Sequence, residues 1–204
     1  MTCAPSTVCF LICLMAAAGP SLARAAKAPQ PPADSAAPAP KILVAYYSRT
    51  GTTRAVAQEL ASRLGADLEE IVDTRGRKGF WGWLGAGRDA SKKSKTTIAP
   101  VKRDPAGYDL VVLGTPVWAW NMTPAIRTYI LANRDGFKQV AFFCTMGKNG
   151  DVKTFAGMAE LCGQKPLAAM ALRTEEVKIR QYQSGINKFL IALKDTVDRQ
   201  GGWN

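Results

Sequence analysis

A run of apolar β-formers at residues 42–47 stops at a turn rich in hydroxyl groups, and a helical pattern begins directly after it. This order predicts a buried strand, a short loop and the N-terminus of a helix. Hydroxyl side chains and one glycine fill the turn: Ser48, Thr50, Gly51, Thr52 and Thr53. Backbone N–H groups at a helix start lack intrahelical partners and lie at the positive end of the helix dipole, so the turn predicts an anion site.

The composition of this turn favours a phosphate monoester over a longer phosphate chain. No Gly-Lys-Ser/Thr closes the turn, so it is not the Walker A loop that binds triphosphates. No Gly-x-Gly-x-x-Gly is present, so it is not the dinucleotide fingerprint either. A second interpretation stays open at this point, in which the hydroxyl groups only cap the following helix.

Strand-like and helix-like patterns alternate through residues 41–200, which we assign to one domain. Strands are predicted at residues 41–47, 67–72, 109–114, 139–145 and 166–172. Helices are predicted at residues 53–64, from 124 behind a cap at Thr123, behind a cap at Asp151, and at 182–199. The first, third and fourth strands are apolar on both faces, as in parallel sheets that helices cover on both sides. The pattern predicts an α/β fold, a doubly wound five-stranded parallel sheet in three layers, with ligands bound at the carboxyl ends of the strands.

Residues 74–103 interrupt this alternation with a basic, aromatic insert. It holds nine Lys or Arg residues against the single acid Asp89, together with Phe80, Trp81 and Trp83. We expect a loop and a helix near residues 81–93 here. Two interpretations stay open: contact with an anionic membrane surface or an acidic partner, or an aromatic plug that packs over the sheet.

The first 40 residues differ in composition from the rest. An apolar run at residues 8–18 precedes Ala23-Arg24-Ala25, which predicts a signal peptide at residues 1–25 and export to the periplasm. Translation from Met15 would instead leave the protein in the cytoplasm. Residues 26–40 are rich in Pro and Ala and predict an extended linker.

Charge and composition exclude several classes of function. The 204-residue chain has a net charge of +11 and no histidine, which removes histidine bases, histidine metal ligands and the Ser-His-Asp triad. We expect no metal site. The basic charge favours acidic partners, but no nucleic-acid-binding motif accompanies it, so we expect no nucleic acid. Cys144 and Cys162 fall at opposite ends of a predicted helical connection and are expected to be buried free thiols.

Two further loops follow predicted strands at the ligand-binding edge. Residues 114–124 include Trp118 and Trp120, and residues 144–150 include Gly147 and Gly150. Tryptophans at this edge either pack on neighbouring elements or cover a flat aromatic ligand. Because a predicted phosphate loop lies beside them, we favour the role of covering a flat aromatic ligand.

The three loops together resemble the FMN loops of flavodoxin-like proteins. The resemblance rests on Ser48-x-Thr50-Gly51-x-Thr53, on Thr115-Pro116-Val117-Trp118 and on Cys144-Thr145-Met146-Gly147, and it covers residues 41–199. It implies the strand order 2-1-3-4-5 with FMN at the point where the order reverses. By this resemblance, the phosphate is held by Ser48, Arg49, Thr50, Gly51, Thr52 and Thr53. The ring is lined by Pro116, Val117, Trp118 and Ala119 and bordered by Thr145, Met146 and Gly147.

The resemblance implies an FMN-dependent redox protein. It is either an electron carrier, with a redox partner that the basic charge predicts to be acidic, or an NAD(P)H- or quinone-linked oxidoreductase. The alternative is a flavodoxin-fold module for binding or assembly that does not use FMN. The chain departs from the family pattern in being basic and in having Trp120 where a small residue is usual.

Overall fold

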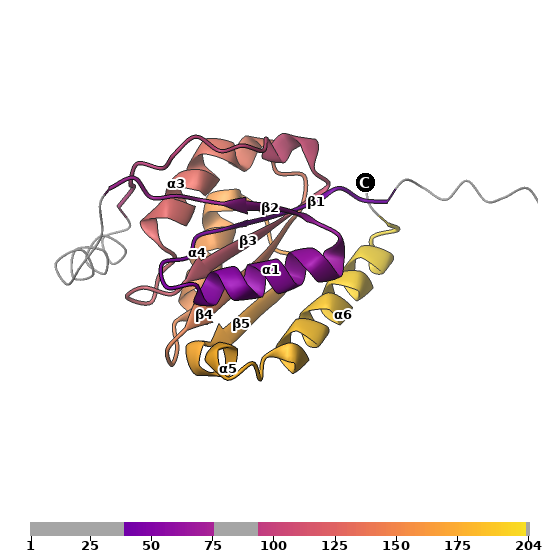
Figure 1. Cartoon of the computed structure of the whole chain (residues 1–204). Coiled ribbons are helices and arrows are strands. Elements are labelled where there is room, and N and C mark those ends of the chain that lie inside the picture. The colour runs from indigo at the N-terminus through magenta and orange to yellow at the C-terminus, as the bar shows by residue number, and fades with distance from the viewer. Residues whose placement is uncertain (1–38, 76–93, 203–204) are drawn as a thin grey trace, which may run out of the picture. The chain divides into compact units, whose positions relative to one another are not determined.

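A computed structural model describes residues 39–75 and 94–202 of the chain (Figure 1). The predicted signal peptide at residues 1–25, nearly all of the linker and the helix expected near residues 81–93 lie outside the described residues. Among the residues that are described, no helix is long and apolar enough to cross a bilayer.

The centre of the domain is a five-stranded parallel sheet in the order β2-β1-β3-β4-β5. Its strands are β1 (Ile42–Tyr46), β2 (Asp67–Glu70), β3 (Leu110–Pro116), β4 (Val140–Met146) and β5 (Ala169–Arg173). Every residue of β1 is buried, as are all but the last residues of β3 and β4. The predicted fold class and strand order are confirmed.

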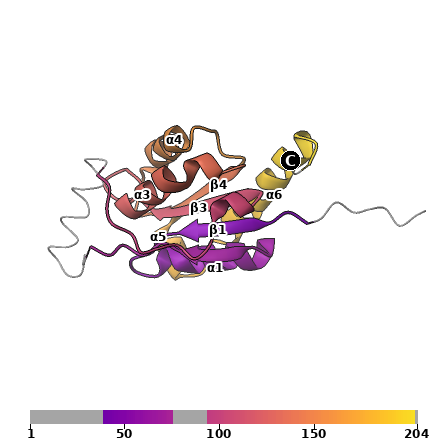
Figure 2. The same ribbon diagram turned by 90° about the horizontal axis from the view of Figure 1, so that it is seen from above.

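Helices cover both faces of the sheet, as the two-sided burial of its central strands requires (Figure 2). One face packs against α1 (Thr52–Leu64), α5 (Thr174–Lys178) and α6 (Gln183–Arg199). The other packs against α3 (Pro124–Asn133) and α4 (Asp151–Cys162). Short 3₁₀ turns at Pro105–Gly107 and Arg134–Gly136 precede β3 and β4. Each helical crossover returns the chain to the same end of the sheet, so the loops after the strands share one edge.

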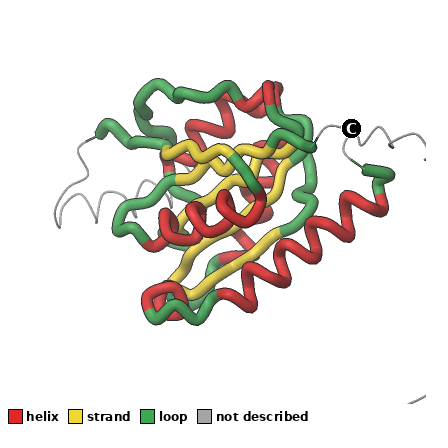
Figure 3. Tube along the Cα trace, turned by 45° about the vertical axis from the view of Figure 1, so that its right-hand side comes forward, coloured by secondary structure: helices red, strands yellow, loops and turns green. Residues whose placement is uncertain are grey.

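The sequence-based prediction is wrong about the cap of α4 and lacks α5. The N-cap of α4 is Gly150 with φ of 113°, and Asp151 is the first helical residue instead of the cap. Helix α5, visible at the end of β5 in Figure 3, was not predicted. It is only five residues long and buries Val177 alone, so it leaves no periodic apolar pattern in the sequence.

Strand β2 is shorter than predicted because the chain beyond it changes partner. Ile71 still donates its N–H to the Tyr46 carbonyl (2.7 Å). Residues 72–74 then pair antiparallel with the segment that returns from the insert. The Ala99 N–H donates to the Val72 carbonyl and the Thr74 N–H to the Thr97 carbonyl, both at 2.9 Å. The two ends of the insert, described at residues 74–75 and 94–103, are therefore joined beside β2.

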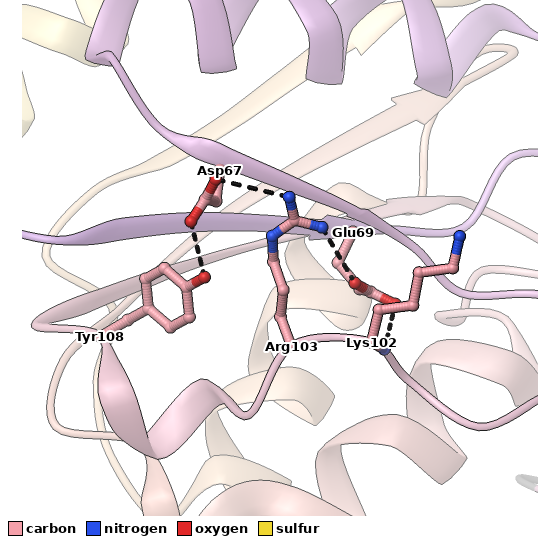
Figure 4. A network of polar contacts seen from close by, with 5 residues as sticks. All are labelled: Asp67, Glu69, Lys102, Arg103 and Tyr108. Atoms are coloured by element: carbon pink, nitrogen blue, oxygen red, sulfur yellow. Dashed lines mark hydrogen bonds and ion pairs between the residues drawn. The ribbon is translucent and has the colours of Figure 1, made fainter.

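A polar network fixes this returning segment to β2 (Figure 4). Asp67 and Glu69 are two residues apart on the strand and share a face, and Arg103 lies within 3.5 Å of both carboxylates. Glu69 is only 3% exposed and also accepts the Lys102 N–H at 3.0 Å. Tyr108 donates its hydroxyl to Asp67 at 2.7 Å, which is the main cause that lowers the pKa of this carboxyl. The network closes the edge of the sheet on the side of β2.

The two cysteines of the described residues are buried and free, as the sequence predicted. Burial raises the pKa of the Cys144 thiol and of the Cys162 thiol to about 12. Both sulfurs therefore stay protonated near neutral pH and pack as small apolar groups.

Gly114 is needed where β3 passes Phe143 of β4. A methyl group at this glycine would overlap the Phe143 ring, which is fully buried. We predict that Gly114→Ala lowers the free energy of unfolding by about 1–3 kcal/mol, because the fully buried ring would have to shift within a close-packed core. Denaturant unfolding measures this. The control is Gly107→Ala, where an added methyl meets no atom within 4 Å. Equal losses in the two variants would contradict the packing argument.

Candidate functional site

The loops after β1, β3 and β4 enclose a cavity of about 470 Å³ at the carboxyl edge of the sheet. Its lining residues come from these three loops, and one more comes from the start of α5. They are Arg49, Thr50, Thr52, Thr53, Pro116, Val117, Trp118, Thr145, Met146, Gly147 and Thr174. All except Thr174 are among the residues predicted from the sequence. The predicted residues Ser48, Gly51 and Ala119 belong to the same loops but do not line this cavity.

The first loop presents an open helix N-terminus to the cavity. Gly51 is the N-cap of α1 with φ of 89°, a left-handed conformation that glycine adopts without strain. Gly51 has no side chain with which to cap α1, and among the described residues the Thr50 hydroxyl contacts the Thr52 hydroxyl and the Thr53 hydroxyl contacts Thr145. The interpretation in which the hydroxyl groups only cap the helix is therefore not what the structure shows. The first N–H groups of α1 keep their capacity to bind an anion.

Ser48 supplies a further polar group at this loop. Its Oγ is buried, and among the described residues it has no hydrogen-bond partner. A buried hydroxyl without a partner costs free energy that a bound acceptor would recover. This hydroxyl belongs to the loop that leads into the uncapped helix start, although Ser48 does not itself line the cavity.

A buried hydroxyl pair joins the first loop to the third. Thr53 Oγ1 and Thr145 Oγ1 are 2.8 Å apart, and both residues are nearly inaccessible to solvent. The second and third loops are joined as well, because the Val117 N–H donates to the Thr145 carbonyl at 2.8 Å. Thr145 therefore ties all three loops together.

The second loop makes a tight turn at residues 118–121. The Trp118 N–H donates to the Asn121 carbonyl at 2.9 Å, and the Asn121 N–H donates back at 3.0 Å. Ala119 and Trp120 both have positive φ, 46° and 58°. This is the conformation of a type I′ turn in residues that seldom adopt it, at a cost on the order of 1 kcal/mol each. Of the two tryptophans in this turn, only Trp118 lines the cavity.

The two tryptophans have different environments. Trp120 is 59% exposed, and its indole N–H donates to Asn149 of the third loop at 3.0 Å. Trp118 is half-buried and lines the cavity. The Tyr47 ring meets the Trp118 ring edge-on, with 5.6 Å between the centroids and an interplanar angle of 89°. Trp118 is therefore the tryptophan that forms an aromatic wall in the cavity.

The two arginines near the first loop also separate. Arg49 lines the cavity, and its guanidinium carbon lies 5.9 Å from the centroid of the Trp118 ring. Arg54, in the first turn of α1, instead pairs with Glu70 of β2 at 2.5 Å. Glu70 also accepts the Tyr46 hydroxyl at 3.3 Å. Arg54 is thus held toward β2 and does not line the cavity.

Thr174 lines the cavity but was not predicted from the sequence. It begins α5 directly after β5, and the Glu176 carboxylate accepts the Arg173 N–H at 3.1 Å. The Glu176 contact resembles one half of a capping box. The sequence carries this signal as a Thr followed by two Glu residues after a strand, without an apolar repeat to draw attention to it.

No cluster of metal-ligating side chains occurs within the described part of the chain. The cavity instead combines a helix N-terminus with free hydrogen-bonding capacity, an indole wall and a rim of backbone from the third loop. It lies after β1 and β3, at the point where the strand order reverses.

A family model described as Flavodoxin matches residues 41–170. The chain belongs to the flavodoxin family. Among solved structures, this flavodoxin-family chain is similar to a flavoprotein in complex with FMN from Lactobacillus acidophilus. The TM-score is 0.56, the identity is 21%, and 71% of this chain and 99% of that chain are covered. A flavoprotein from Bacteroides eggerthii gives a TM-score of 0.52 at 23% identity, covering 72% of this chain and 98% of that chain. At these identities the likeness shows the fold. The comparison with curated proteins gives no match.

We predict that the Thr53–Thr145 pair holds the flavodoxin loops together even without a ligand. Thr53→Val and Thr145→Val should each lower the free energy of unfolding by about 1–3 kcal/mol, because each leaves a buried hydroxyl unpaired. The double variant should lose clearly less than the sum of the two, because it removes both polar groups. Denaturant unfolding of all three variants tests this, and strictly additive losses would show that the hydroxyls are not coupled.

Proposed function

We propose that this protein binds FMN non-covalently in the cavity between the three loops and acts as a redox protein. The observation that carries the proposal is the combination of two features in one cavity. The uncapped start of α1 with the Thr50 and Thr52 hydroxyls suits a phosphate monoester, and the Trp118 wall suits a flat ring. FMN is a cofactor that unites both groups in one molecule.

The comparisons support the same cofactor. The family model is that of flavodoxin, and the flavoprotein from Lactobacillus acidophilus is described in complex with FMN. The fold shared with that protein is the scaffold that presents three loops at one sheet edge.

Each loop has its own part in the proposed binding. The N–H groups at the start of α1 and the hydroxyls of Ser48, Thr50 and Thr52 would hold the phosphate. Trp118 would pack against the ring and exclude water from one side of it. The third loop would border the ring with the backbone of Gly147. The space beside this glycine is open, because an added Cβ would meet no atom within 4 Å. When bound, FMN supplies the transfer of electrons or hydride, and the protein sets its orientation and electrostatic surroundings.

We predict that the purified protein binds FMN with a dissociation constant below about 1 μM and that Thr50→Asp weakens this at least 100-fold. The new carboxylate would face the phosphate dianion, and repulsion between charges about 4 Å apart costs several kcal/mol near a protein surface. Thr50→Asn has nearly the same shape without the charge and serves as the matched control, with a small loss of affinity. Titration followed by flavin fluorescence measures all three constants.

The proposal fails if the unaltered protein does not bind FMN. It also fails if Thr50→Asp and Thr50→Asn bind FMN equally well, because the phosphate would then lie elsewhere. The first result would favour a flavodoxin-fold binding module that does not use FMN.

A further inference from the structure

Arg49 brings a positive charge to the cavity. Among the described residues that line the cavity, Arg49 alone carries a charged side chain, and the described lining includes no Asp or Glu. The remaining described lining residues are Thr, Pro, Val, Trp, Met and Gly. The described lining therefore presents one cation and no anion to an occupant.

The contact with Trp118 determines where this cation lies. The guanidinium carbon of Arg49 is 5.9 Å from the centroid of the Trp118 ring, within the range of a cation–π interaction. Trp118 itself is held by the edge of Tyr47 and by the paired hydrogen bonds of the turn at residues 118–121. Arg49 is half-buried. It belongs to the first loop, and its guanidinium contacts Trp118 of the second loop.

Arg54 provides an internal comparison. It is five residues further along, carries the same charge and forms an ion pair with Glu70 of β2, outside the cavity lining. The structure thus assigns one arginine to the cavity and the other to the edge of the sheet.

We propose that Arg49 raises the reduction potential of FMN bound in this cavity, by stabilising the negative charge of the reduced ring. The inference rests on the proposed function. Uptake of two electrons and one proton leaves the ring with one more negative charge than the oxidised ring. A cation beside the ring, in surroundings of lower dielectric than water, favours that charge. The phosphate carries the same charge in both oxidation states at a given pH, so a cation that served only the phosphate would leave the potential unchanged.

The test is the potential of the full chain loaded with FMN, equilibrated without oxygen against a reference dye while dithionite supplies the electrons. At a fixed dye potential, Arg49→Gln should lower the ratio of reduced to oxidised FMN about tenfold, which is about 30 mV for a two-electron couple. Arg49→Lys keeps the positive charge, so its ratio of reduced to oxidised FMN should stay close to that of the unaltered protein. Arg54→Gln is the matched control and should leave the ratio unchanged.

Separate affinities for oxidised and reduced FMN give the same information where binding is weak, because their ratio fixes the shift in potential. The proposal predicts that Arg49→Gln weakens binding of reduced FMN about tenfold more than binding of oxidised FMN. Equal weakening of both forms, or an equal shift in Arg54→Gln, overturns it. Absence of FMN binding in the unaltered protein overturns the proposed function. Tight FMN binding with an unmoved potential in Arg49→Gln overturns only the role of Arg49.

Discussion

Burial of the central strands on both faces is the constraint on which the rest of this structure depends. Strands β1, β3 and β4 present apolar side chains to both sides, so helices must cover both faces and the connections must be crossovers. Parallel strands joined in this way place all their following loops at one edge. Gly114 of β3 pairs with Phe143 of β4, and the missing side chain leaves room for the Phe143 ring in this register.

The loops at this edge act as one preorganised unit because hydrogen bonds cross between them. Thr53 contacts Thr145 from the first loop, Val117 contacts the Thr145 carbonyl from the second, and Trp120 contacts Asn149. A site whose parts are fixed before binding loses less conformational entropy when it binds. The strained residues Ala119 and Trp120 fit this account, since strain is retained where the surrounding contacts determine the backbone.

The sequence predicted the sheet and most of the lining because both depend on local patterns. Apolar runs identify the strands, and the Thr-rich turn after β1 identifies the start of α1. What it did not predict depends on partners distant in the chain or on elements too short to repeat. Arg49 contacts Trp118 and Arg54 contacts Glu70, and neither partner is near its arginine in sequence. Thr174 lines the cavity because it begins the five-residue helix α5, which is too short to leave a repeating pattern. At the start of α4, the sequence offers both Gly150 and Asp151 as helix caps.

The most direct test of the account is the absorption spectrum of the protein purified under native conditions from cells that make it. If the protein binds FMN as proposed, the spectrum shows the visible bands of an oxidised flavin, and FMN is the molecule released on denaturation. A colourless protein that also takes up no FMN, when incubated with it and separated by gel filtration, would contradict FMN binding between the three loops. The three loops would then form a scaffold that does not bind flavin.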